Sequence, residues 1–146
     1  ITGALADFNK SAELETDNYK KSNILFKIAT IVRKSNKVQA RNYLNQSIKA
    51  NPSNGRAYLL LAALYADSAN ECGESQFDKR AVYWLAAKTA DRAGRVDPSL
   101  RDTAAKAVES YNAKAPSKTD IFNSGRAGET ITFSCWVGGS VTVPSL

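Results

Sequence analysis

The chain has 146 residues, of which 43% are hydrophobic and 23% are charged, and its formal net charge is +6. These values are typical of a single globular unit, which excludes a disordered, collagen-like or cysteine-dense chain. Histidine is absent and there are only two cysteines. The counts exclude a Ser-His-Asp triad, a Cys-His pair, histidine-ligated zinc and an all-cysteine zinc site. We therefore expect no metal site.

Other routes to catalysis also lack support in the sequence. The carboxylate pair Glu71 and Glu74 lies in a polar segment, with no apolar surroundings to raise a pKa. The glycine pair Gly138-Gly139 is not followed by the Lys and helix of a phosphate-binding loop. The composition and motifs predict a protein without enzyme activity and without a cofactor.

Positive charge is concentrated in one part of the chain. Nine Lys and Arg residues and no acidic residue lie between Asn18 and Ala66, and all nine fall within residues 20–56. Such a block favours an anionic partner, either nucleic acid or lipid headgroups. It is also consistent with a solvated surface that the acidic segments on either side balance after folding. Both interpretations remain open from the sequence.

Helical periodicity dominates the first three quarters of the chain. Apolar residues recur at helical spacing in six segments, at residues 2–15, 20–34, 37–50, 55–69, 77–95 and 98–112. The segment 55–69 is apolar nearly all round, so we expect it at the centre of the fold. Its longest apolar run is too short to span a membrane. The chain begins at Ile1 without a methionine, which suggests a processed or truncated product, and any export signal would lie upstream of it.

The pattern changes near the C-terminus. Residues 130–137 alternate strictly between apolar and polar side chains, which predicts a β-strand. Gly138-Gly139 is a two-residue turn signal, and residues 140–143 predict a second strand. A two-stranded hairpin alone is barely stable in water, so it has to pack against the helices or another chain.

Two of the helical segments end alike, and this similarity indicates a repeat. Each carries small residues twelve and five positions before a proline: Ala40 and Ser47 before Pro52, and Ala86 and Ala93 before Pro98. The spacing resembles the tetratricopeptide repeat, a pair of antiparallel helices of 34 residues. Because the two prolines are 46 residues apart, the second copy carries about 12 extra residues, near 66–77, relative to that repeat.

The resemblance implies a mainly α fold, an antiparallel helix-pair array (an α-α superhelix) closed by a C-terminal β-hairpin. Residues 1–115 would form the repeats, with the first half-repeat truncated, and residues 116–146 would form a tail packed on them. The segment from Asp120-Ile121-Phe122 through Cys135-Trp136 to Gly139 is similar to a tail found in bacterial cell-envelope repeat proteins. This likeness implies a periplasmic or outer-membrane-associated protein with a binding or assembly role.

In such repeats the first helix of each pair lines a concave groove for a partner protein. The matching positions of this chain are Leu25, Arg33, Arg56, Leu59, Ala63 and Asp67. The two arginines suit an acidic or extended segment, or a subunit of a larger envelope complex. The chain's own last helix or hairpin could instead fill the groove. Without a helix-turn-helix, an RNP strand or a zinc module, nucleic acid is not the expected partner, and membrane association would be indirect.

Three interpretations of Cys72 and Cys135 are open. A disulfide between them would hold the hairpin on the repeats and explain how it stays docked. Two unrelated buried thiols in a cytosolic protein are the alternative, and a reactive Cys135 has no histidine to activate it. For Trp136 the pattern allows either a cover over the helices or an exposed contact, whereas Tyr83 and Trp84 are expected in the core.

Overall fold

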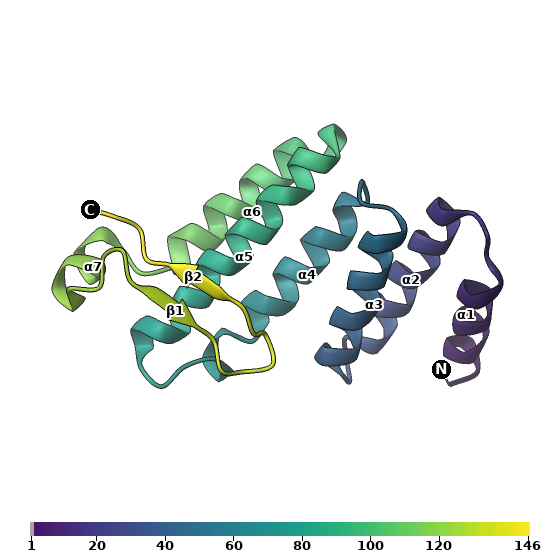
Figure 1. Cartoon of the computed structure of the whole chain (residues 1–146), viewed down its shortest axis with the longest axis horizontal. Coiled ribbons are helices and arrows are strands. Elements are labelled where there is room, and N and C mark those ends of the chain that lie inside the picture. Colours follow the sequence, from purple (N-terminus) through teal and green to yellow (C-terminus); the bar gives the residue numbers. More distant parts are fainter. Residues whose placement is uncertain (1) are drawn as a thin grey trace.

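The structure of the chain is a computed structural model that describes residues 2–146, and it is mainly α-helical with a small hairpin near the C-terminus (Figure 1). The helices are α1 (Thr2–Leu14), α2 (Asn18–Val32), α3 (Lys37–Ala50), α4 (Gly55–Asp67), α5 (Gln76–Val96), α6 (Arg101–Lys114) and α7 (Lys118–Ser124). Two 3₁₀ turns, η1 (Ala69–Glu71) and η2 (Pro98–Leu100), precede α5 and α6. The strands are β1 (Thr130–Thr132) and β2 (Ser140–Thr142). The mainly α fold class predicted from the sequence is confirmed.

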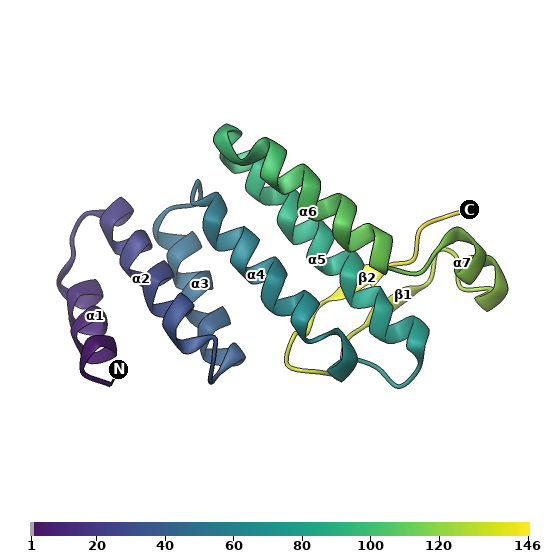
Figure 2. The same ribbon diagram turned by 180° about the vertical axis from the view of Figure 1, so that it is seen from behind.

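The first six helices pack in chain order instead of closing into a bundle. Each of the helices α1 to α5 contacts the helix that follows it. In Figure 1, α3 lies in front of α2 and α5 in front of α6, whereas α4 lies between the two pairs. Figure 2 shows the opposite face, on which α2 and α6 lie in front. An array of this kind exposes long helix faces to other molecules, although here the C-terminal hairpin covers part of α5.

Local capping explains why most of these helices begin where the sequence predicts. The side chains of Asp17, Asn36 and Ser75 accept hydrogen bonds from backbone N–H groups of the first turns of α2, α3 and α5. Each bond satisfies a donor that has no partner inside the helix. Asp97 does the same for η2, where Pro98 occupies the first position. The expected helix 98–112 is therefore a 3₁₀ turn followed by α6.

The repeated small residues lie where helices meet. Ala40, Ser47, Ala86 and Ala93 are all fully buried. Ser47 and Ser22 of α2 exchange hydrogen bonds of 2.8–2.9 Å, and the Asn54 amide donates to the Ser22 hydroxyl at 2.9 Å. This buried network joins α2, α3 and the start of α4 with its polar atoms satisfied.

The second helix pair is formed by α4 and α5. The start of α4 lies close against the end of α5 because the residue at this contact is Gly55, which has no side chain. A Cβ atom on Gly55 would lie 2.8 Å from the Ala93 carbonyl oxygen and 2.8 Å from Leu100 Cδ1. We expect Gly55→Ala to cost about 1–3 kcal/mol of stability, because the backbone has to move apart. Gly94→Ala is the matched comparison, since its closest contact is 3.1 Å and a helix interior gains from alanine. Urea unfolding of both variants checks this, and equal losses would contradict it.

Two apolar clusters form the core. The first joins α1 to α4, with Ile28 and Leu44 fully buried at its centre. The second joins the start of α5, α7 and the hairpin through Val82, Ile121 and Val143. Tyr65 and Trp136 pack against both clusters. Tyr83 and Trp84, which were expected in the core, are half-buried and pack against the outside of the second cluster.

The hairpin differs from the prediction in its length. The strand expected over 130–137 ends at Thr132. This strand, β1, pairs with β2 in a register that places Ile131 opposite Val141. The chain then turns at residues 135–138, where the Gly138 N–H donates to the Cys135 carbonyl at 3.1 Å. Gly138 and Gly139 both have positive φ angles, 63° and 69°, which only glycine adopts readily. The expected two-residue turn is therefore part of a seven-residue loop, residues 133–139.

A short helix, α7, lies where the sequence suggested only the start of the tail. Ser117 accepts a hydrogen bond from the Asp120 N–H, and Asp120 accepts one from the Ser117 N–H. This capping box begins the helix, and Ile121 is its one buried residue. Such a short helix presents too little apolar periodicity to be detected by spacing alone.

Candidate functional site

The hairpin loop is attached to the helices by a disulfide. Cys72, after η1, and Cys135, in the loop, form an S–S bond of 2.08 Å across a sequence separation of 63 residues. The expected pairing is thus present in the structure. A structural disulfide fits an oxidising, extracytoplasmic compartment. Within residues 2–146, none of the helices is both long and apolar enough to cross a membrane.

Trp136, next to Cys135, covers the ends of the helices. Its indole N–H donates to Ser68 Oγ at 3.0 Å, and its ring centroid lies 6.0 Å from that of Tyr65. The Arg41 guanidinium lies 5.4 Å from the indole centroid, and its Nη1 donates to the Trp136 carbonyl oxygen. Of the two sequence interpretations, the cover over the helices is the observed one.

Beyond Trp136, a groove runs between α3 and α5, with α4 as its floor. Tyr58, Leu61 and Tyr65 of α4 line the floor of this α3–α5 groove. Ile48 of α3 and Leu85 of α5 contribute the apolar parts of the walls. The groove has a volume of about 280 Å³. Its walls come from α3 and α5, the helices that lie in front in Figure 1. It is an apolar and aromatic surface, the usual floor of a site that takes a side chain of another molecule.

The rim of the α3–α5 groove is polar and basic. Asn45 lies on the α3 side, whereas Lys88 and Arg92 lie on the α5 side, one helical turn apart. All three side chains are exposed. Burial raises the pKa of the Tyr65 phenol above its ordinary value, and the nearby Arg41 and Arg92 partly oppose this increase. Positive charges on both sides of the groove thus act on the Tyr65 phenol at its floor.

The residues that the repeat resemblance pointed to lie mostly on α2 and α4, away from this groove. Arg56 is exposed, and its guanidinium lies 4.5 Å from the Phe26 ring centroid of α2. Leu59, Ala63 and Arg33 are half-buried, and Asp67 is exposed.

Leu25 requires a correction. It is 3% exposed and packs within the first apolar cluster, because α2 turns that face toward α1 and α3. The small exposed part of the Leu25 side chain lies in a hollow between α2 and α3, which Lys21 and Lys49 also line. The residue is therefore a core position of the helix array.

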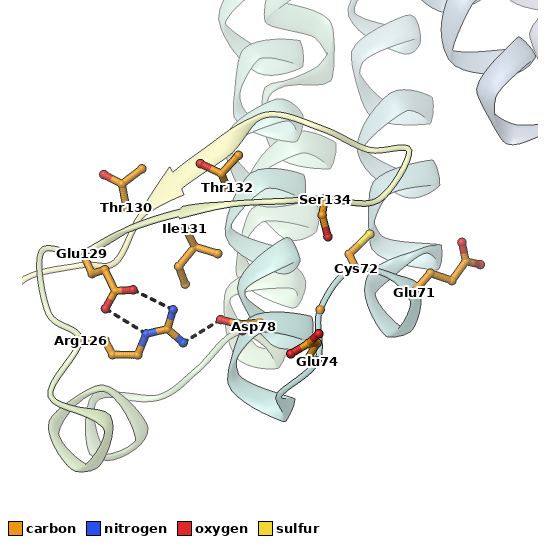
Figure 3. Close-up of a pocket in the computed structure, with 11 residues that line it drawn as sticks. Glu71, Cys72, Glu74, Asp78, Arg126, Glu129, Thr130, Ile131, Thr132 and Ser134 are labelled. Carbon is orange, nitrogen blue, oxygen red and sulfur yellow. Dashed lines mark hydrogen bonds and ion pairs between the residues drawn. The ribbon is translucent and has the colours of Figure 1, made fainter.

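A second hollow, shown in Figure 3, lies between β1 and the segment that runs from the end of η1 to the start of α5, residues 71–78. Its polar lining includes Glu71 and Glu74, the carboxylate pair noted in the sequence. The Arg126 guanidinium bridges Asp78 at 2.7 Å and Glu129 at 2.9–3.1 Å (Figure 3). These hydrogen bonds raise the pKa of Arg126 and lower that of Glu129. No cluster of potential metal ligands occurs among the residues that the structure describes.

Arg80 makes a second connection between α5 and the tail. Its guanidinium donates to the carbonyl oxygens of Lys114 and Ala115 at the end of α6. It also donates to Asp120 Oδ2, at the start of α7, at 3.1 Å. The cation thus satisfies carbonyl groups at one helix end and a carboxylate at the next helix start.

These carboxylates predict the pH dependence of stability. Hydrogen bonds from Ser117, and then the charge of Arg80, lower the pKa of Asp120, and Arg126 lowers that of Glu129. Because both groups bind protons more weakly in the folded state, stability is greatest above their ordinary pKa values of 3.8 and 4.5 and is lost as the pH falls below them.

Urea unfolding between pH 7 and pH 2.5 measures this dependence. The variants Asp120→Asn and Glu129→Gln should reduce the acid-induced loss, because each removes a group that has to be protonated. An unchanged pH profile in the double variant would contradict the assignment.

The comparisons with known proteins give no relative for this chain: no family model matches it, and no curated protein or solved structure matches it.

Proposed function

We propose that this chain is a non-catalytic protein-binding module of the bacterial cell envelope, periplasmic or outer-membrane-associated. In this proposal its helix pairs are tetratricopeptide-like, and its partner is another protein or a subunit of a larger complex. The observation that carries the proposal is the α3–α5 groove, whose apolar floor and polar rim lie on an open helix array. The disulfide supports an extracytoplasmic location.

Site-specific photocrosslinking in intact cells tests this function. A benzoylphenylalanine at Asn45 probes the α3–α5 groove, and one at Arg56 probes the face formed by α2 and α4. Glu109, an exposed residue of α6, is the control position. We expect a discrete crosslinked protein from Asn45 or Arg56 but not from Glu109. Equal labelling from all three positions, or none from any, would contradict a protein-binding role.

An anion-binding module for nucleic acid or lipid headgroups is the second candidate. Its support is that Lys37 is the only cation of residues 20–56 that forms a salt bridge with a described residue. Apart from this one pair with Glu71, the acidic segments do not neutralise the block through direct pairs among the described residues. Counterion release predicts that binding to a polyanion falls steeply with salt, whereas a protein partner depends less on salt and more on its sequence.

A further inference from the structure

The cations of the α3–α5 groove are not paired with any carboxylate of the described residues. Neither Lys88 nor Arg92 forms a salt bridge or a side-chain hydrogen bond with the described residues. Asp91, their neighbour on α5, is paired with Arg95 at 2.8 Å. None of the residues that line the groove is acidic. The rim therefore carries positive charge that the fold itself does not neutralise.

The floor adds a second requirement for whatever binds there. Tyr58 and Tyr65 are half-buried, and Leu61 between them is 6% exposed. Ile48 and Leu85 extend the apolar surface up the two walls. An occupant that covers this floor has to supply apolar or aromatic side chains as well as negative charge.

Trp136 and Arg41 lie beside the groove where Tyr65 ends the floor. Since Arg41 is held by the Trp136 carbonyl oxygen and lies against the indole ring, its position is fixed by the tail. Its charge acts on the Tyr65 phenol, as does that of Arg92. Positive groups from α3 and α5 thus flank the same stretch of floor.

We propose that the α3–α5 groove binds an acidic segment of a partner protein, with carboxylates at Lys88 and Arg92 and apolar side chains over Tyr58 and Leu61. This inference rests on the proposed protein-binding function and names the chemistry of the partner. A nucleic acid fits less well, because two rim cations offer few phosphate contacts and the floor is partly aliphatic.

Selection of peptides from a random twelve-residue phage library on the whole disulfide-bonded chain tests the proposal. The selected peptides are synthesised with a fluorophore, and their affinities are measured by fluorescence anisotropy. We expect them to carry net negative charge and at least one aromatic or large aliphatic residue. The double variant Lys88→Glu/Arg92→Glu should lower their affinity at least tenfold, because both attractive contacts become repulsive.

The matched control is Lys10→Glu/Lys106→Glu, which makes the same charge change at exposed positions on α1 and α6. It should lower the affinity less than threefold, and circular dichroism checks that both variants remain folded. Tyr58→Ala should also weaken the peptides, which separates contact with the floor from charge attraction alone.

Several results would overturn the inference. These are peptides without net negative charge, equal affinity for the two double variants, failure to select any peptide, or tighter binding of single-stranded dT12 than of the peptides. If Arg56→Glu removes binding and Lys88→Glu/Arg92→Glu does not, the partner binds to the α2–α4 face. In that case the protein-binding function would stand and this groove assignment would fall.

Discussion

Removing the Cys72–Cys135 disulfide should lower the free energy of unfolding by about 4 kcal/mol in the simple loop-entropy model. The estimate follows from the sequence separation of 63 residues, since the cross-link closes a long loop in the unfolded chain. The effect should be largest in the tail. Of the tail's two secondary-structure units, the hairpin has strands of three residues each, and α7 buries only Ile121.

Urea unfolding of the Cys72→Ser/Cys135→Ser variant measures this loss, and hydrogen exchange locates it. We expect fast exchange at residues 116–146 and slower exchange in α2 to α4, which have their own apolar cluster. The control is to add a reductant to both proteins: it should destabilise the wild type and leave the double serine variant unchanged. A loss below about 1 kcal/mol, the size of a single ordinary contact, would contradict the predicted role of the disulfide.

Replacing Trp136 with alanine should cost about 3 kcal/mol, because the indole packs against both apolar clusters. The substitution removes the contact with Tyr65, the hydrogen bond to Ser68 and the stacking of Arg41. Trp136→Phe keeps an aromatic ring and loses the N–H donor, so its cost should be about 1 kcal/mol.

A double-mutant cycle that combines Trp136→Phe with Ser68→Ala isolates the hydrogen bond within this contact. Ser68 Oγ also donates to the Leu64 carbonyl oxygen at 3.1 Å, so the serine keeps one partner when the indole is removed. We expect a coupling of about 1 kcal/mol between the two substitutions, measured by urea unfolding. Additive losses would show that the indole N–H contributes nothing to the docking of the tail.

The helices were predictable because their signals are local. Apolar spacing and caps such as Asn36 and Ser75 lie within a few residues of the helices that they define. The small residues before Pro52 and Pro98 also predicted where helices approach closely, and the structure buries all four of them. These features depend on residues that lie close together in the sequence, so they can be recognised from the sequence alone.

The tail was harder to predict because long-range contacts shape it. Alternation continues to Val137, yet the strand ends at Thr132 because the loop has to bring Cys135 to Cys72 and Trp136 to Ser68. Helix α7 had one detectable signal, the capping box of Ser117 and Asp120. The apolar periodicity did not reveal α7, because this helix contributes a single buried residue.

The candidate site also combines features that local sequence patterns predict with features that depend on long-range packing. Repeat positions pointed to the α2–α4 face, where Arg56 and Asp67 are exposed but Leu25 is buried. The α3–α5 groove instead combines residues from three helices, such as Ile48, Tyr58 and Arg92. Their convergence depends on how the pairs pack, and no spacing within one helix predicts it.

The covalent connection of the tail to the helix array is tested most directly by peptide mapping of the purified chain. Thiols are blocked at lysis, the protein is digested without a reductant, and the peptides are identified by mass spectrometry. The predicted result is one disulfide-linked pair that contains Cys72 and Cys135, with neither cysteine carrying the blocking group. Two blocked thiols in protein taken from an oxidising compartment would contradict it.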